Sequence, residues 1–313
     1  MKLADFDFAF PKELIAQEPL ARRDGSRLLV LHRGSGRIEH RMFPDLLEYV
    51  KPGDLFVLND TRVVPARLIG HRATGGRIEA LLVAKLDDRR WEALLDSGGK
   101  LKPGERFTLE GGSGVMIVGK QVDRWTLEFD GPVESLLERV GRMPLPPYIR
   151  REEREGDRER YQTVYAAHPG AIAAPTAGLH FTPELLAKLS TTRLTLHVGT
   201  GTFKPVKSEN VEEHRMDPEV YGIPPETLQA VKQAGRVVAV GTTVCRTLEA
   251  WARSGAPSGA SDLFIHPPFE FRVVRALLTN FHLPKTTLLM LVCAFAGREA
   301  ILSAYREAVE RRY

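Results

Sequence analysis

The feature that most constrains the fold is a change of pattern near residue 63. From about Val63 to Asp130, short apolar or alternating segments recur at roughly the spacing of sandwich and barrel strands, with glycine- and proline-rich turns between them. Their two-residue period is typical of half-buried strands, so we predict an all-β domain in this region. The predicted strands are 63–69, 77–84, 91–95, 106–109, 115–118 and 125–129, and a helix follows over 134–140.

Segments of α/β character lie on both sides of this region. Buried strands are predicted at 55–58 and 237–240, and helices at 245–253 and from Thr286 or Thr287 to about Gly297. Thr182 and Pro183 have the types expected at a helix start. We therefore predict an α/β body with a mixed sheet, interrupted by an inserted all-β barrel domain. Residues 1–62 and 145–313 form the discontinuous body, and residues 63–144 form the insertion.

Length and composition exclude several classes of protein. The 313 residues fit two domains, and 43% hydrophobic with 27% charged residues argues against a disordered chain, a coiled coil or a collagen-like fibre. The longest strongly apolar run, 288–296, is shorter than the roughly 20 residues that a membrane span needs. No signal peptide is expected, because the first residues include Asp5 and Asp7 and lack a long apolar segment. Two unclustered cysteines favour a reducing compartment, so we expect a cytoplasmic protein.

The charge balance permits an RNA partner without requiring one. Lysine and arginine number 44 against 40 acidic residues, a net charge of +4. Residues 150–160 contain five arginines and five acids, which allows either a basic RNA-binding arm or a solvated strip of balanced charge, and the balance favours the strip. Other arginines that are candidate RNA contacts are Arg22, Arg23, Arg27 and Arg67.

Four loops that follow predicted strands carry polar groups suited to ligand binding. They are residues 59–62, 173–181, 196–203 and 241–243, and a similar polar interruption holds Asn280 and His282. In open α/β sheets ligands bind where strands hand over to helices. Alternatives remain for each loop: a polar turn at 59–62, a satisfied core histidine at His180, and a simple helix cap at Thr242 or Thr243.

Several common catalytic motifs are missing from the sequence. Gly199 and Gly201 suggest a dinucleotide fingerprint, but Lys204 stands at its last glycine position. Neither a phosphate-binding P-loop nor a GxSxG nucleophile elbow occurs. The histidines are far apart and form no HExxH pattern, so no metal site is predicted.

Taken in order, the polar segments resemble one family along the whole chain, the S-adenosylmethionine:tRNA ribosyltransferase-isomerases of queuosine biosynthesis. Each segment alone is weak, but their number and order are specific. The matching segments are DFDF at 5–8 with 11–17, 23–28, 53–67 with NDTR at 59–62, PPYI at 146–149, YQTVY at 161–165, APTAGLHF at 174–181, LHVGTGTF at 196–203, His214 with Glu219 and Tyr221, GTT at 241–243 with 246–249, and LLTNFHLP at 277–284.

The resemblance implies a body with an inserted barrel and a transferase-isomerase activity in tRNA modification. The ribosyl part of S-adenosylmethionine would be transferred to 7-aminomethyl-7-deazaguanine at the tRNA wobble position, giving epoxyqueuosine-tRNA, adenine and methionine. S-adenosylmethionine would be a co-substrate, and no prosthetic group is implied. The expected partners are S-adenosylmethionine and the tRNA anticodon stem-loop, with no membrane, and we expect a monomer.

The resemblance indicates which residues form the active site, and the chemistry of the reaction suggests which roles they must fill. The sulfonium acidifies the neighbouring ribose C5′ hydrogens, so a base could form an ylide, and departing adenine needs a proton donor. Catalytic candidates are His180, His197, His282, Asp60 and Glu249. Candidates for binding S-adenosylmethionine or RNA phosphates are Asn59, Arg62, Thr176, Gly178, Gly199, Gly201, Thr202, Gly241, Thr242, Thr243, Arg246 and Asn280.

Three departures from the family pattern put local geometry in doubt. Asp217 stands where a second histidine is expected after His214, and the stretch 189–194 is shorter than usual. The sequence stops at Tyr313, where the family continues with an aromatic, glycine and acidic tail.

Two rival functions are weaker on the same residues. An ordinary S-adenosylmethionine-dependent RNA methyltransferase would need a glycine-rich nucleotide loop near the first strand, which is missing. A non-enzymatic RNA-binding barrel protein would not need the polar loops outside the all-β region, and its basic excess would be larger.

Overall fold

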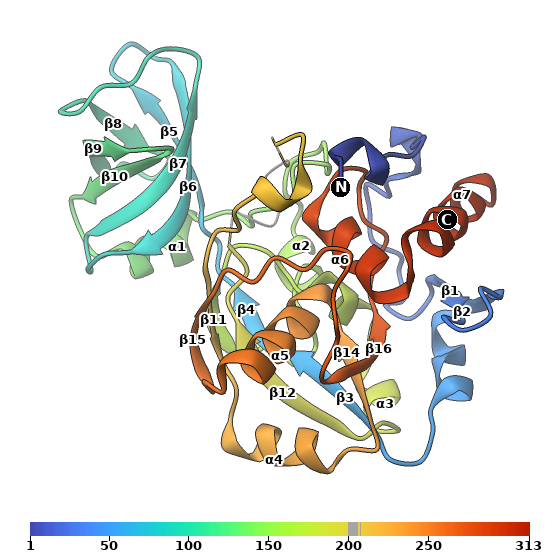
Figure 1. Ribbon diagram of the computed structural model, residues 1–313. Helices are drawn as coiled ribbons and strands as arrows, with labels where there is room; N and C mark the ends of the chain where they lie inside the picture. The colour runs from blue at the N-terminus through green and yellow to red at the C-terminus, as the bar shows by residue number, and fades with distance from the viewer. Residues whose placement is uncertain (200–205, 207) are drawn as a thin grey trace.

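The computed structural model describes residues 1–199, 206 and 208–313, and it places a small barrel beside a larger α/β body (Figure 1). The body has a mixed six-stranded sheet in the order β15-β13-β12-β3-β14-β16. Strands β12, β3, β14 and β16 pair in parallel, and β13 pairs antiparallel with both β12 and β15. The bounds are β3 Asp54–Asn59, β12 Thr191–Leu196, β13 Glu219–Gly222, β14 Arg236–Val240, β15 Ser258–Ser261 and β16 Val274–Leu278.

The middle of this sheet is buried on both faces. Every residue of β3 is buried, and so are the last four of β14, as expected for parallel strands covered by helices and loops on each side. The predicted strands at 55–58 and 237–240 are therefore confirmed. Smaller pairs complete the body: β1 Arg27–Leu31 with β2 Ile38–Met42, and β4 Thr61–Val63 with β11 His168–Ala171.

The barrel is closed by antiparallel strands in the order β10-β7-β6-β5-β8-β9. Alternate residues of β6 are buried, so the two-residue period in the sequence identified the inward-facing side chains correctly. One predicted strand was wrong: the run 63–69 is broken into the end of β4 and the start of β5, and Pro65 stands in the gap, where it has no N–H for a ladder. The bounds are β5 Arg67–Arg72, β6 Arg77–Lys85, β7 Arg90–Ser97, β8 Arg106–Leu109, β9 Gly114–Gln121 and β10 Arg124–Phe129.

Two helices begin at the capping threonines that the sequence indicates, whereas the helix predicted at 245–253 begins earlier, at Thr242, directly after Gly241. Thr182 accepts a 3.3 Å hydrogen bond from the Leu185 N–H at the start of α3, and Thr286 does the same for Leu289 at the start of α6. The α-helices are α1 Val133–Val140, α2 Asp157–Arg160, α3 Pro183–Leu186, α4 Pro225–Gln233, α5 Thr242–Ser254, α6 Thr287–Ala296 and α7 Arg298–Glu310. The 3₁₀ helices are η1 Leu3–Phe6, η2 Lys12–Leu14, η3 Phe43–Tyr49, η4 Thr176–His180 and η6 Val211–Glu213.

An α/β body with an inserted barrel, the predicted fold class, is confirmed. Backbone bonds between Arg67 and Arg142 (3.1 and 2.8 Å) bring the two ends of the barrel segment together. We propose that the insertion spans residues 63–144 and that residues 1–62 and 145–313 form the body. In the described part of the chain no single helix is long and apolar enough to cross a membrane; α6 and α7 together have the length and composition, but the chain bends by 115° between them.

The charged strip at 150–160 uses its arginines within the molecule. Arg151 forms a two-pronged ion pair with the buried Asp157 (2.6 and 2.8 Å), and Arg154 pairs with Glu18. Arg158 and Arg160 donate to the carbonyls of Gly141 and Leu20. These contacts favour the balanced strip over a free basic arm.

Asp157 makes the stability of the fold depend on pH in the acid range. Hydrogen bonds from Arg151 hold the pKa of Asp157 below its ordinary value, although burial opposes them. The pair therefore stabilises the protein above the unfolded-state pKa of about 4, and this stabilisation is lost as the pH falls through the lower folded-state pKa. We expect Asp157→Asn to lower the midpoint of thermal unfolding at pH 7 and to lose less further stability below about pH 4. A parallel loss in mutant and wild type at every pH would contradict this.

Candidate active site at the carboxyl edge of the sheet

Four of the predicted polar loops meet along one edge of the sheet. Asp60 follows β3, His197 follows β12, Gly241 follows β14 and Asn280 lies just beyond β16. Parallel strands end on the same side of a sheet, so these residues share its carboxyl edge although they are distant in sequence. The fifth segment, η4, joins them, because the Ala177 Cβ lies 3.9 Å from the place where a side chain at Gly241 would begin.

Asp60 is held firmly at this edge. It is buried, and its Oδ1 accepts a 2.6 Å hydrogen bond from Thr195 Oγ1 on β12. Its Oδ2 lies 3.7 Å from Nε2 of His168, whose side chain is 63% exposed. Sequence patterns did not single out His168. The pairing of β11 with β4 brings His168 next to Asp60, and the sequence does not predict this pairing.

His197 lies next to this carboxylate and is suited to accept a proton. Its Nδ1 is 2.8 Å from Thr61 Oγ1, and Gly170 leaves room for the ring, since a Cβ there would lie 2.8 Å from Cε1. Burial lowers the pKa of His197, the neighbouring His168 lowers it further, and Asp60 acts in the opposite direction. A neutral imidazole at pH 7 can act as a general base.

His180 and Asn280 form a second polar pair on the same edge. The side-chain nitrogen of Asn280 is 3.0 Å from His180 Nε2. Burial lowers the pKa of His180, and a hydrogen bond with the Arg23 backbone opposes this shift. The ring of Phe43 lies 5.2 Å from the imidazole. Asn280 Oδ1 is buried and has no hydrogen-bond partner among the described residues, so this oxygen is available to a ligand.

His282 is neutral under ordinary conditions. Its Nε2 is 3.1 Å from Thr279 Oγ1, its backbone N–H donates to the Tyr305 hydroxyl at 3.1 Å, and burial lowers the pKa of His282 to about 4. A cationic His282 is therefore excluded as the proton donor at neutral pH. A neutral one can still accept a proton or a hydrogen bond.

Helix α5 begins beside a buried ion pair. Gly241 adopts φ +96°, which favours glycine, and Thr242 and Thr243 follow it in the first turn. Arg246 pairs with Glu219 of β13, and Glu219 also accepts a 2.9 Å hydrogen bond from the Gly199 N–H. Burial lowers the pKa of Arg246 to about 10, so it stays charged at neutral pH. A narrow cavity here is lined by Met216, Thr242, Thr243, Arg246, Leu263, Phe264, Ile265, Thr287, Leu288 and Leu291.

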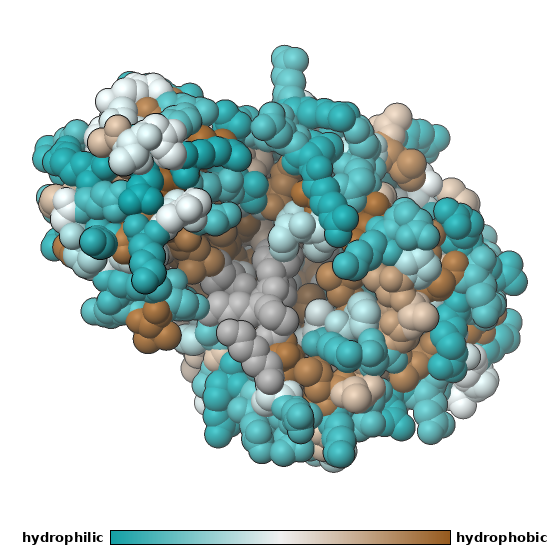
Figure 2. Space-filling view, turned by 90° about the horizontal axis from the view of Figure 1, so that it is seen from above, coloured by the Kyte–Doolittle hydropathy of each residue, from teal (hydrophilic) through white to brown (hydrophobic). Residues whose placement is uncertain are grey.

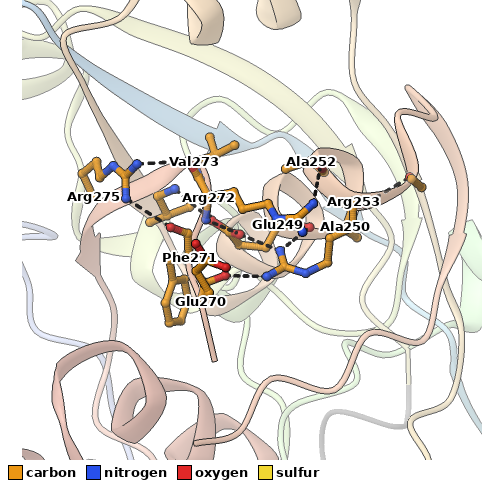
Figure 3. A network of polar contacts seen from close by, with 11 residues as sticks. Glu249, Ala250, Ala252, Arg253, Glu270, Phe271, Arg272, Val273 and Arg275 are labelled. Atoms are coloured by element: carbon orange, nitrogen blue, oxygen red, sulfur yellow. Dashed lines mark hydrogen bonds and ion pairs between the residues drawn. The ribbon is translucent and has the colours of Figure 1, made fainter. Parts of the chain in front are cut away.

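Glu249 has contacts typical of a structural carboxylate (Figure 3). It is 0% exposed and accepts 2.9 Å bonds from the backbone N–H groups of Arg272, Val273 and Val274. Arg253, one turn along α5, completes the network at 2.8 Å. These groups lie at the start of β16, whereas Asn280 lies beyond its other end. A catalytic role for Glu249 stays a prediction, and these contacts weigh against it.

The remaining predicted residues divide into structural, exposed and undescribed ones. Asn59 is fully buried and brackets the backbone of Leu196 with bonds of 2.9 and 3.0 Å, which joins β3 to β12. Arg62 is exposed, and Thr176 begins η4. Gly201 and Thr202 lie outside the described residues.

Gly178 is tightly packed, and we expect Gly178→Ala to be destabilising. A Cβ there would overlap the Tyr165 hydroxyl and lie 2.8 Å from Thr163 Cγ2, and both neighbouring side chains are buried. Relieving such overpacking typically costs about 1–3 kcal/mol, which the midpoint of urea unfolding would report. Gly156→Ala is the matched control, since a Cβ there meets nothing within 4 Å. Equal midpoints for the two variants would contradict the packing at Gly178.

The surface above the body is hollowed. Seen from above, a depression separates the barrel from the body, and hydrophobic residues gather on its sides (Figure 2). Within residues 1–199, 206 and 208–313, no group of three or more His, Cys, Asp or Glu side chains is arranged to hold a metal ion.

Comparison with known proteins gives matches over the whole chain. The family model described as queuosine biosynthesis protein matches residues 3–313. A protein of Thermotoga maritima named S-adenosylmethionine:tRNA ribosyltransferase-isomerase is 50% identical over 326 aligned residues, covering 100% of this chain and 96% of the relative. One of the same name from Symbiobacterium thermophilum is 52% identical over 334, with the same coverage.

A solved structure supports the same relationship. The crystal structure of S-adenosylmethionine tRNA ribosyltransferase from Thermotoga maritima matches with a TM-score of 0.55 and 39% identity, covering 99% of this chain and 95% of that one. The sequence matches and the structural match therefore both cover nearly the whole chain, including the motifs at the strand ends. The chain belongs to the queuosine biosynthesis protein family, the family of these tRNA ribosyltransferase-isomerases.

Proposed function

We propose that the protein transfers and isomerises the ribosyl group of S-adenosylmethionine onto 7-aminomethyl-7-deazaguanine at the wobble position of a tRNA. The products are epoxyqueuosine-tRNA, adenine and methionine. Relatives about 50% identical over the full chain, which carry the name of this activity, support the reaction class. The single structural observation that supports it best is the position of the buried Asp60 carboxylate near His197 at the carboxyl edge of the sheet.

His197 is the candidate for the base that removes a ribose C5′ proton. The sulfonium of S-adenosylmethionine acidifies this proton, and a neutral imidazole near its own pKa is an effective acceptor. One ring nitrogen of His197 bonds Thr61, which fixes the ring and leaves the other nitrogen to face the substrate. Asp60, held by Thr195, then stabilises the imidazolium that forms.

The departure of adenine needs a proton, and His168 is the candidate donor. His168 lies within 3.7 Å of Asp60 and is exposed enough to exchange protons with solvent. His180, oriented by Asn280, lies on the same edge, but burial lowers its pKa, which makes it a poorer donor, as for His282. The buried oxygen of Asn280 without a partner is suited to a substrate N–H group, such as the aminomethyl or the base itself.

The start of α5, with Thr242 and Thr243, is suited to an anionic group. Thr242 and Thr243 lie in the first turn of α5 and line the narrow cavity, and the N-terminus of a helix favours negative charge. The methionine carboxylate of S-adenosylmethionine is the group we assign there. The neutral thioether of the methionine product would meet an apolar lining in the cavity beside Met216, Leu263 and Phe264.

We propose that the tRNA is recognised through its anticodon stem-loop, that the protein acts as a monomer, and that it acts in the cytoplasm. Wobble-position chemistry requires an accessible single-stranded loop, which anticodon stem-loops provide.

The proposal is tested by incubating the protein with S-adenosylmethionine and tRNA that carries 7-aminomethyl-7-deazaguanine. We expect one adenine released for each tRNA modified. Formation of S-adenosylhomocysteine in place of adenine would indicate methyl transfer and contradict the proposal. Binding of tRNA without any small-molecule product would contradict it as well.

A further inference from the structure

Phe281 stands apart from the other aromatic side chains of the protein. It is 45% exposed, and it alone among the aromatic residues in the described part of the chain belongs to the exposed class. It lies between two residues of the candidate site, Asn280 and His282, whose side chains bond His180 and Thr279. The ring therefore lies exposed next to the candidate site, where a substrate bound at the site can reach it.

The ring is held in place from below. It makes edge-to-face contacts with Tyr305 (centroids 5.1 Å apart, 83° between planes) and Tyr313 (5.7 Å, 75°). Tyr305 in turn accepts the His282 N–H and contacts Phe8 at 5.3 Å. Phe281 is therefore a rigid platform, which loses little conformational entropy when a ligand stacks on it.

Positive charge lies next to this platform. The Arg27 guanidinium is 4.1 Å from the centroid of the Tyr313 ring and donates to the carbonyls of Arg311 and Arg312. Carbonyl groups are neutral, so these bonds do not neutralise the positive charge of Arg27. The Lys285 ammonium, 47% exposed, pairs with Asp7 at 2.6 Å. Asp7 offsets the charge of Lys285, so Arg27 supplies the positive charge beside the ring. An exposed aromatic ring with a nearby cation is the combination that binds single-stranded nucleic acid, the ring stacking a base and the cation holding a phosphate.

We infer that Phe281 stacks against an unpaired base of the tRNA, a neighbour in the anticodon loop of the nucleoside that reacts. This inference rests on the proposed function, which makes tRNA the second substrate. Phe281 directly follows Asn280, so the base on the ring lies beside the one in the site and not within it. The adenine of S-adenosylmethionine is a poorer occupant, because small ligands are held in enclosed pockets and this ring lies on the outer rim.

The test compares Phe281→Leu, which keeps apolar packing but removes the flat ring, with Phe281→Trp, which keeps a ring. The substrate is full-length tRNA carrying 7-aminomethyl-7-deazaguanine, and adenine release is measured while each substrate is varied. Because stacking is typically worth about 1–3 kcal/mol for each base, we expect Phe281→Leu to raise the KM for tRNA by roughly ten- to a hundredfold. The KM for S-adenosylmethionine and the unfolding temperature should stay near wild type.

Phe281→Trp provides a direct readout of stacking. We expect it to keep a KM for tRNA near wild type, and its added indole fluorescence should be quenched when tRNA binds. Leu86→Ala, which shortens an exposed apolar side chain on the barrel, is the matched control and should leave both KM values unchanged.

Three results would overturn the inference. One is a wild-type KM for tRNA in Phe281→Leu. The second is a selective rise in the KM for S-adenosylmethionine, which would assign the ring to the co-substrate. The third is a drop in unfolding temperature that accounts for the whole loss. Failure of the proposed function is distinguishable from these, since the wild-type protein would then release no adenine at all.

Discussion

Replacing His197 with alanine is expected to slow adenine release by about 10²- to 10⁴-fold, the usual contribution of a general base. His197 bonds Thr61 through one nitrogen and lies near Asp60, and it is the histidine at the sheet edge with the clearest means of orientation. Single-turnover assays at saturating substrates would measure the chemical step. His71→Ala, at an exposed histidine of the barrel, is the matched control and should react like the wild type.

The pH dependence of the wild type gives an independent check on the same residue. A base must be unprotonated to act, and burial places the pKa of His197 below its ordinary value. On the acid side the rate should therefore fall only at a pH below about 6.5, as His197 gains a proton. His197→Gln should lack this acid limb. A His197→Ala enzyme within threefold of wild type would remove His197 from the mechanism.

Replacing Glu249 with alanine is expected to cost about 3–5 kcal/mol of unfolding free energy. The change leaves three backbone N–H groups, of which that of Val274 is buried, without an acceptor and Arg253 without its carboxylate. Stabilities of whole proteins are only about 5–15 kcal/mol, so the variant should unfold at a much lower urea concentration. The midpoint and slope of urea unfolding, followed by circular dichroism, would measure this.

Glu310→Ala is the matched control for this change. Glu310 is exposed in the last turn of α7, where a negative charge is unfavourable, so its removal should leave the stability nearly unchanged. Glu249→Gln keeps a hydrogen-bond acceptor and should lose less than Glu249→Ala. If Glu249→Ala were as stable as Glu310→Ala, the network in Figure 3 would not support the fold.

The fold followed from local patterns to a large extent. The alternation in β6 and the uninterrupted apolar run in β3 identified a barrel and a buried sheet, because side-chain period depends directly on which faces are covered. The strand predicted at 63–69 failed at Pro65, where a missing N–H outweighs an apolar sequence.

The site followed from the sequence only in part. The sequence placed Asp60, His197 and Asn280 at strand ends, and parallel pairing then put them on one edge. His168 escaped notice because its approach to Asp60 depends on the pairing of β11 with β4, between segments about a hundred residues apart. Glu249 was a catalytic candidate, but its side chain contacts the beginning of β16, at the other end of that strand from Asn280.

The central claim is that the ribosyl group, and not the methyl group, of S-adenosylmethionine reaches the tRNA. Two preparations of S-adenosylmethionine, one labelled in the ribose and one in the methyl group, test it with the same modified tRNA. Label from the ribose should enter the tRNA in step with adenine release, and label from the methyl group should stay with the released methionine. Methyl label in the tRNA, with none from the ribose, would contradict the claim.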